Sequence, residues 1–194
     1  EDSRLITVNK KGGNFSTIKE AVDSITDSSE SNRYQILVGP GEFMEQEIDM
    51  VGKPYVSVVG STIQTTIIKP LTQAQNIFSI GEYNELSFLW LEGAGVGYAG
   101  VDVNDSGDYS QVHKVTINNC NIGVNIQSST QDTIFYGEYL DINGGYDYGV
   151  RVVANNGFIA DVNLENYYNF PESTGSTVCT YVSGFGAKVH VSTC

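Results

Sequence analysis

The chain has 194 residues, of which 40% are hydrophobic and 17% are charged, and its formal net charge is −13. This length and hydrophobic content suit one folded domain with a sizeable core and exclude an intrinsically disordered chain. An acidic surface repels nucleic acid and anionic membranes, and no apolar run is long enough to span a bilayer, so we expect neither nucleic-acid binding nor membrane insertion.

The first predicted element is a short amphipathic helix within NFSTIKEAVDSITDSS, residues 14–29. Ser16 or Thr17 can serve as its N-cap, and Glu20, three residues after Thr17, completes a capping box. The apolar residues that follow recur at spacings of three and four, which places them on one helix face: Ile18, Ala21, Val22 and Ile25. A buried strand over 36–38 comes next.

Short apolar strands and turns fill the rest of the chain, with no further helix expected. The tetrapeptide Gly-Val-x-Val/Ile stands at 100–103, 123–126 and 149–152, and a looser copy closes at 187–191. The copies begin 23 and then 26 residues apart, so the repeating unit is two short strands with their turns. Such a unit is too short for a propeller blade, which needs about 40 residues. The spacing therefore favours a parallel β-helix, in which each coil lies on the one before.

Such stacking gives each residue of the tetrapeptide a place. We expect internal ladders of Val101, Val124, Val150 and of Val103, Ile126, Val152, with outward side chains at Asp102, Asn125 and Arg151. The preceding glycines would permit a bend between faces. An antiparallel sandwich is the alternative, but hairpin dipeptides are scarce.

The predicted fold is thus all-β, a single right-handed parallel β-helix with a short N-terminal capping helix. We expect one domain over 1–194, in which 1–33 form the cap, 34–194 form the coils, and a loop at about 167–178 projects from them.

Three segments resemble the N-terminal part of the pectin-lyase-like superfamily of right-handed β-helices. They are GGNFSTIKEAVDSI, YQILVGPGEFMEQ and VSVVGSTIQTTIIKP, within residues 12–70. The resemblance implies the fold. It leaves function open, because the superfamily includes pectin esterases, lyases, polysaccharide hydrolases, and the stalks and spikes of viral and phage particles.

Two further motifs resemble those of pectin methylesterases: STQDTIF and INGGYDYG. The resemblance implies Asp132 as an acid, Asp147 as a nucleophile and Gln131 as an oxyanion donor, with Arg151 nearby. The alignment of successive coils argues against such a site. If Asp147 is the nucleophile, the Gln-Asp-Thr motif should lie at the matching position of the preceding coil, where the outward residue is Asn125. We therefore expect no catalytic residues; the alternative is a polysaccharide esterase or lyase that uses these four side chains.

Aromatic residues suggest a glycan-contacting surface, since exposed rings stack on sugar faces. The candidates lie in two consecutive turns and in the expected projecting loop: Tyr136, Tyr139, Tyr146, Tyr148, Tyr167 and Tyr168.

A calcium-loop spacing occurs at Asp102, Asn104, Ser106 and Asp108, but the twelfth position is His113 rather than Glu. An Asx-type turn explains this segment without a metal, and we expect no metal and no cofactor. Three cysteines form no disulfide framework, and whether Cys179 and Cys194 pair stays open.

The preferred interpretation is a non-catalytic structural module of a viral, phage or cell-surface assembly, located outside the cell or on a virion. Its expected partners are further copies of itself, as in a trimer, or other subunits, and a glycan. The polysaccharide-acting enzyme is the competing interpretation.

Overall fold

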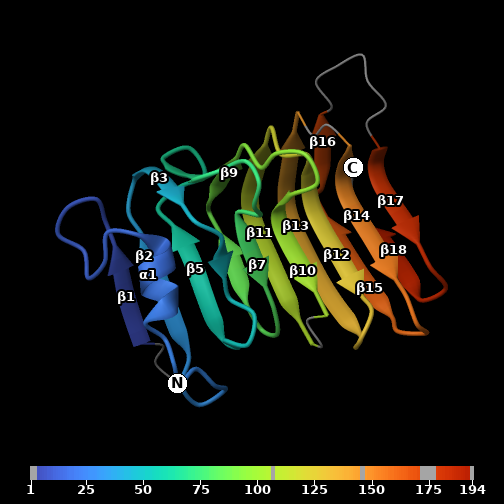
Figure 1. Cartoon of the computed structure of the whole chain (residues 1–194), viewed down its shortest axis with the longest axis horizontal. Coiled ribbons are helices and arrows are strands. Elements are labelled where there is room, and N and C mark those ends of the chain that lie inside the picture. Colours follow the sequence, from blue (N-terminus) through green and yellow to red (C-terminus); the bar gives the residue numbers. More distant parts are fainter. Residues whose placement is uncertain (1–3, 106–107, 145–146, 171–177, 193–194) are drawn as a thin grey trace.

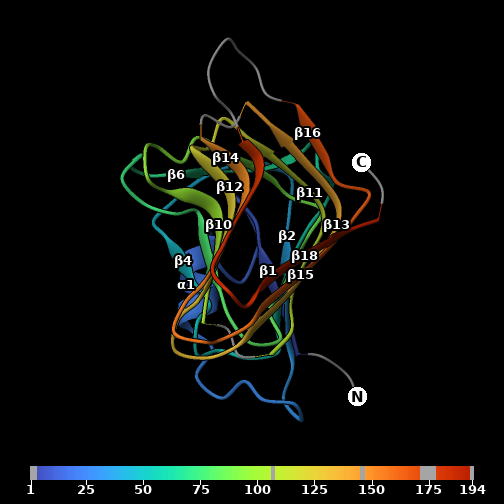
Figure 2. The same ribbon diagram turned by 90° about the vertical axis from the view of Figure 1, so that its right-hand side faces the viewer.

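A computed structural model describes residues 4–105, 108–144, 147–170 and 178–192 of the chain. These residues form an all-β, right-handed parallel β-helix with one short helix (Figure 1). Seen from the end of the stack, strands of two sheets face each other across the core (Figure 2). The predicted fold class is confirmed in this form.

The smaller sheet has six parallel strands, one from each of six coils. In chain order they are β4 (Ile48–Asp49), β7 (Phe78–Ile80), β10 (Ala99–Asn104), β12 (Ile122–Ser128), β14 (Tyr148–Ala154) and β17 (Val178–Ser183).

The larger sheet has twelve strands in two rows. The first row contains β1 (Arg4–Val8), β2 (Tyr34–Val38), β5 (Val56–Gly60), β8 (Glu85–Ser87), β11 (Ser110–Asn118), β13 (Thr133–Asn143), β15 (Ala160–Glu165) and β18 (Ala187–Val191). The second row contains β3 (Gly41–Glu45), β6 (Thr66–Pro70), β9 (Trp90–Glu92) and β16 (Tyr168–Phe170). The long strands β11 and β13 run through both rows, so a coil has three strand segments, not the two that the sequence predicts.

The predicted ladders are confirmed. Val101 pairs with Val124 and Val124 with Val150, and all three side chains are fully buried. The second ladder, from Val103 through Ile126 to Val152, has the same register. Parallel pairing places like side chains one above another at about 4.8 Å, so the period-2 apolar pattern packs the interior.

The recurrence of glycine before each valine has another cause than the predicted bend. Gly100 and Gly123 lie inside strands, where a Cβ would approach neighbouring atoms too closely. At Gly123 it would lie 2.4 Å from the Gly149 oxygen and 2.7 Å from Ile142 Cδ1. These glycines therefore allow close packing between coils.

The helix α1 (Ile18–Asp23) begins where the sequence predicts. The Thr17 side chain accepts a hydrogen bond from the Glu20 amide at 3.3 Å. Instead of a capping-box partner, the buried carboxylate of Glu45 accepts the amides of Ile18 at 2.9 Å and Lys19 at 3.3 Å. The helix packs on β1 to β4. No helix among the described residues has the length and apolar character of a membrane span.

Two strands lie in segments that the predicted division of the chain assigns to the cap and to the projecting loop. The segment expected to be only a cap contains β1, which pairs in parallel with β2. Within the span of the expected projecting loop, Tyr168–Phe170 pair with β13 as β16, and residues 171–177 lie outside the described part.

Candidate functional site

A column of aromatic side chains runs across the coils on the outer face of the larger sheet. The register aligns Arg33, Tyr55, Tyr83 and Tyr109 at the start of successive strands of the first row. Tyr55 and Tyr83 stack with ring centroids 4.5 Å apart, and the Arg33 guanidinium lies 4.9 Å from the Tyr55 ring. Tyr136 continues the column by stacking on Tyr109 at 4.7 Å.

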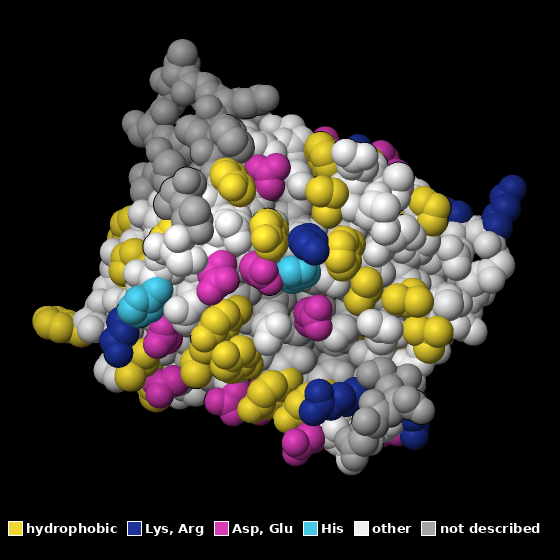
Figure 3. Space-filling view, turned by 180° about the vertical axis from the view of Figure 1, so that it is seen from behind, with side chains coloured by type: hydrophobic (Ala, Val, Ile, Leu, Met, Phe, Trp, Pro, Cys, Tyr) yellow, Lys and Arg dark blue, Asp and Glu magenta, His cyan; other side chains and the backbone are white. Residues whose placement is uncertain are grey.

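Two adjoining cavities, of about 660 and 440 Å³, follow this column and share Glu85, Tyr109 and Gln111 in their linings. We call the two together the tyrosine groove. Figure 3 shows this face, where hydrophobic side chains form a band interleaved with acidic ones. The groove thus combines ring surface with amide and carboxylate groups, which is the mixture that binds sugar hydroxyls.

Hydrogen bonds raise the pKa of two phenols of the groove. The hydrogen bond from the Tyr83 hydroxyl to Asp108, 3.2 Å long, raises the pKa of Tyr83. A hydrogen bond with Tyr109 raises the pKa of Tyr136 in the same way. Tyrosine is neutral at physiological pH even without such contacts, so both hydroxyls serve the groove as neutral polar groups.

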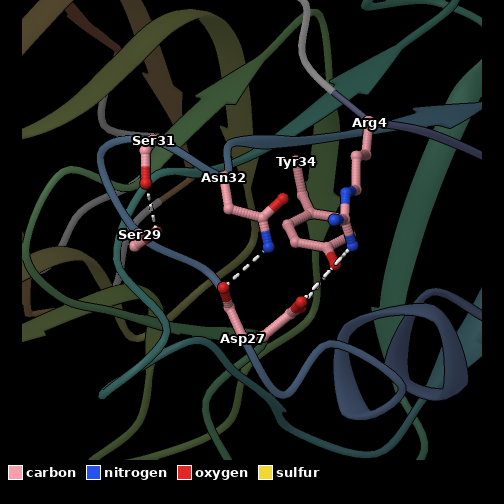
Figure 4. Close-up of polar contacts among 6 residues, drawn as sticks. All are labelled: Arg4, Asp27, Ser29, Ser31, Asn32 and Tyr34. Atoms are coloured by element: carbon pink, nitrogen blue, oxygen red, sulfur yellow. Dashed lines mark hydrogen bonds and ion pairs between the residues drawn. The ribbon is translucent and has the colours of Figure 1, made fainter.

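A network of polar contacts fixes one end of the tyrosine groove at Tyr34 (Figure 4). Arg4 Nη1 donates to the Tyr34 hydroxyl at 2.9 Å, and that hydroxyl donates to Asp27 Oδ1 at 2.5 Å. Asn32 Nδ2 donates to the Asp27 carbonyl oxygen at 2.8 Å, which anchors the loop before β2. The hydrogen bond from Tyr34 holds the pKa of Asp27 below its usual value.

A second polar site lies on the outer face of the smaller sheet. The register stacks Asp49, Ser79, Asp102, Asn125 and Arg151 in one outward column. Arg151 Nη1 donates to Asn125 Oδ1 at 2.7 Å, and Asn125 Nδ2 donates to Asp102 Oδ1 at 2.5 Å. The outward positions predicted for 102, 125 and 151 are confirmed.

Beside Asp102, a cavity of about 620 Å³ is lined by Glu47, Asp49 and Ser79 among others. The Ser79 hydroxyl donates to Glu47 Oε1 at 2.5 Å. Burial raises the pKa of Asp102, the hydrogen bond from Asn125 opposes this rise, and the nearby Glu47 charge adds to it. A carboxyl group with a raised pKa can hold a proton that it could give to a ligand.

The structure does not bring the four candidate esterase residues together. Asp147 precedes β14 at the start of the smaller sheet, whereas Asp132 follows the end of β12. Because the strands are parallel and β12 has seven residues, these carboxylates lie at opposite edges, about 20 Å apart along the strand. Asp132 instead accepts the Ile159 amide at 2.8 Å, and Gln131 donates to the Asp105 carbonyl oxygen.

The candidate glycan tyrosines are also distributed over different surfaces. Tyr136 and Tyr139 lie on the larger sheet, but Tyr148 belongs to the smaller sheet, where it contacts Tyr181 at 5.2 Å. Tyr168 is exposed, while Tyr167 is only 5% exposed because its ring packs in the core, contrary to the prediction. Tyr146 lies outside the described residues.

The calcium-loop candidates do not surround one point. Asp102 and Asn104 belong to β10, Asp108 accepts the Tyr83 hydroxyl on the larger sheet, and Ser106 lies outside the described residues. No group of three acidic, histidine or cysteine residues within the described part could hold a metal ion. Cys120 is a buried free thiol, whereas Cys194 and the Cys179 side chain are outside the described part.

Comparisons with known proteins agree with this architecture. No family model matches the chain. "Probable pectinesterase 50" of Arabidopsis thaliana is 35% identical over 66 residues, which are 34% of this chain and 18% of that protein. Among solved structures, pectin methylesterase PemA from Erwinia chrysanthemi has a TM-score of 0.58 at 12% identity, over 88% of this chain and 66% of that one.

A viral protein is a comparable neighbour. ORF18 of Geobacillus virus E2 has a TM-score of 0.62 at 12% identity, over 92% of this chain and 47% of that one. The chain has the fold of the pectin-lyase-like β-helices. At these identities the likeness shows the fold alone, and the chain spans about a fifth of the pectinesterase it matches.

Sequence reasoning missed Tyr55, Tyr83 and Tyr109, although a signal was present. They are 28 and 26 residues apart, close to the coil period. Nearness along the chain was the wrong guide to aromatic clusters, because side chains in a β-helix meet once per coil.

Proposed function

We propose that this chain is a non-catalytic structural module of an extracellular or virion-surface assembly, and that it holds glycans in the tyrosine groove. The carrying observation is the continuous groove across successive coils, in which Tyr55, Tyr83, Tyr109 and Tyr136 alternate with amide and carboxylate side chains. A rigid β-helix suits this role, because stacked coils fix the spacing of the rings.

Sugar recognition would use two kinds of contact. Ring surface packs against the apolar faces of sugars, while Gln111, Glu85 and the phenol hydroxyls exchange hydrogen bonds with sugar hydroxyls. Tyr109 is central, since it lines both cavities.

Calorimetric titration with soluble polysaccharides tests this function. Tyr109→Ala should weaken binding by about tenfold, because one aromatic contact contributes roughly 1.4 kcal/mol. Tyr181→Ala, on the smaller sheet, is the matched control and should bind like the wild type. Equal binding by all three proteins would refute the groove as the binding surface.

We also propose that the module assembles into a homo-oligomer, with a trimer as the expected form. β17 and β18 end the two sheet orders, and the last described coil exposes Val182, Phe185 and Val191. Such strands can pair with another copy. Sedimentation at micromolar concentration should show the oligomer, and Val182→Lys should shift it toward monomer; a monomeric wild type contradicts the proposal.

The Asp102 cavity favours a second candidate function, a polysaccharide-acting esterase or lyase. Its support is the half-buried carboxyl group of raised pKa beside Glu47 and Ser79. Polysaccharide panels should then yield methanol or unsaturated products. Asp102→Asn should abolish this turnover and Asp147→Asn should not; absence of any product supports the non-catalytic function.

A further inference from the structure

The bend between the two rows of the larger sheet has left-handed backbone in four successive coils. The φ angles are 56° at Phe88, 51° at Lys114, 50° at Tyr139 and 50° at Asn166. These residues occupy one corner, because the residues that precede them are paired in register. Left-handed backbone is unfavourable for bulky side chains and is tolerated by asparagine and glycine.

The bend at the end of the second row is made differently. It uses Gly93, Asn119 and Gly144, which also have positive φ angles and follow paired residues. The backbone of such a bend therefore needs no large side chain. Phe, Lys and Tyr at the first bend oppose the local backbone preference, which points to a role for the side chains themselves.

Those side chains form a ladder on the surface. Lys114 Nζ lies 5.3 Å from the centroid of the Phe88 ring and 5.7 Å from that of Tyr139. The His113 ring meets both rings edge-on, at 6.0 and 6.2 Å. Its Nδ1 is 2.7 Å from Glu138 Oε2. The Lys114 cation is thus engaged by two aromatic rings, and the His113 ring lies against both rings and the Glu138 carboxylate.

The ladder stands beside the tyrosine groove. His113 and Glu138, the residues that directly precede Lys114 and Tyr139, line the smaller cavity together with Tyr109 and Tyr136, and the bend residues lie just beyond that lining. Along β11, His113 follows Tyr109 by four residues, or about 13 Å. A polymeric ligand that lies between the tyrosine column and this ladder would cross several coils.

The charges of the lining favour an uncharged ligand. Glu85, Glu138 and Glu165 line the smaller cavity, whose lining holds no lysine or arginine among the described residues, and the Arg33 guanidinium in the lining of the larger cavity lies over the Tyr55 ring. Sugar hydroxyls can donate hydrogen bonds to these carboxylates, whereas carboxylated sugars would be repelled.

We infer that the bend of Phe88, Lys114 and Tyr139 is the second wall of the groove, and that the groove selects uncharged glycan chains over carboxylated ones. This inference rests on the proposed function. Tyr139, 47% exposed, supplies ring surface to the glycan, and Lys114 holds that ring in place from the adjacent coil.

Affinity electrophoresis tests the inference, with gels that contain hydroxyethyl cellulose, galactomannan, dextran or polygalacturonate. The wild type should be retarded by an uncharged polymer and not by polygalacturonate. Tyr139→Asn and Lys114→Asn should weaken retardation by about tenfold. Asparagine suits this backbone, as Asn166 shows, so both variants should fold; Tyr181→Ala is the control.

The outcomes separate the two proposals. If Tyr139→Asn and Lys114→Asn are retarded as strongly as the wild type while Tyr109→Ala is not, the bend is not the second wall of the groove. The proposed function would still stand in that case. If polygalacturonate retards the wild type as strongly as an uncharged polymer does, the groove does not select by charge. The double variant Glu85→Gln, Glu165→Gln should be retarded by polygalacturonate, because it lacks two of the repelling carboxylates. A wild type that no uncharged polymer retards contradicts the proposed function itself.

Discussion

Ionisation of Asp102 costs stability, because its carboxyl group is partly buried. Its folded pKa is raised, first by burial, so the folded chain binds the proton more tightly than the unfolded chain. Its contribution to stability is therefore greatest below the ordinary pKa of an aspartate and is lost as the pH rises through the raised value. Asp102→Asn should increase the free energy of unfolding at pH 7 but not at pH 3, as measured by urea denaturation.

The side-chain oxygen of the Asp102→Asn variant could still accept the hydrogen bond from Asn125, so the substitution changes mainly the charge. If Asp102→Asn lowers the free energy of unfolding by the same amount at pH 7 and at pH 3, this explanation is wrong. A stability gain at pH 7 would also fit a residue retained for function.

Cys120 should be chemically inert in the folded chain. It is 1% exposed, and burial raises the pKa of its thiol to about 11. Because the thiolate is the reactive form, a disulfide reagent at pH 8 should modify Cys120 only after unfolding. A chain with Cys179→Ser and Cys194→Ser isolates this thiol; rapid modification without denaturant would show that the site is open.

At the scale of elements, α1 depends on a carboxylate from a distant strand. Glu45 is 3% exposed and satisfies two helix amides, while burial raises its pKa. Glu45→Ala should lower the free energy of unfolding by about 1–3 kcal/mol, since it leaves buried amides without an acceptor. Glu45→Gln keeps one acceptor and should cost less; the reverse order in thermal denaturation would contradict this role.

The internal ladder predicts that substitutions on the inner and outer faces of the smaller sheet lower the free energy of unfolding by different amounts. Val124 is fully buried between Val101 and Val150, so Val124→Ala should destabilise the chain by about 2–3 kcal/mol. Val153→Ala, at a partly exposed position of β14, should cost well under half as much. Similar losses in the two variants would mean that the ladder is not the core.

The ladders could be predicted because alternating aliphatic residues report directly which face is buried. The three-segment coil could not, because the residues at the bend itself, Lys114 in β11 and Tyr139 in β13, are neither glycine nor proline. Tyr167 shows the same limit: its neighbours suggested a loop, but pairing of β16 with β13 turns its ring inward.

The candidate site was predictable only in part for a related reason. Asp132 and Asp147 are close in sequence, yet β13 runs between them and they lie at opposite ends of the strands of the smaller sheet. Contacts in this fold are set by register between coils, so Asp102, Asn125 and Arg151, each a coil apart, meet instead.

At the scale of the whole molecule, the two long faces differ in chemistry. The larger sheet carries stacked aromatic rings along an open groove, while the smaller sheet carries the polar column of Asp102, Asn125 and Arg151. With a net charge of −13, the molecule as a whole also disfavours polyanionic ligands. We therefore place the proposed uncharged glycan on the face of the larger sheet.

A crystal structure of the chain with an oligosaccharide of the uncharged polymer it binds tests this claim most directly. We predict sugar density beside Tyr109 and Tyr136, extending toward Tyr139. Density confined to the cavity at Asp102, with the tyrosine groove empty, would contradict it.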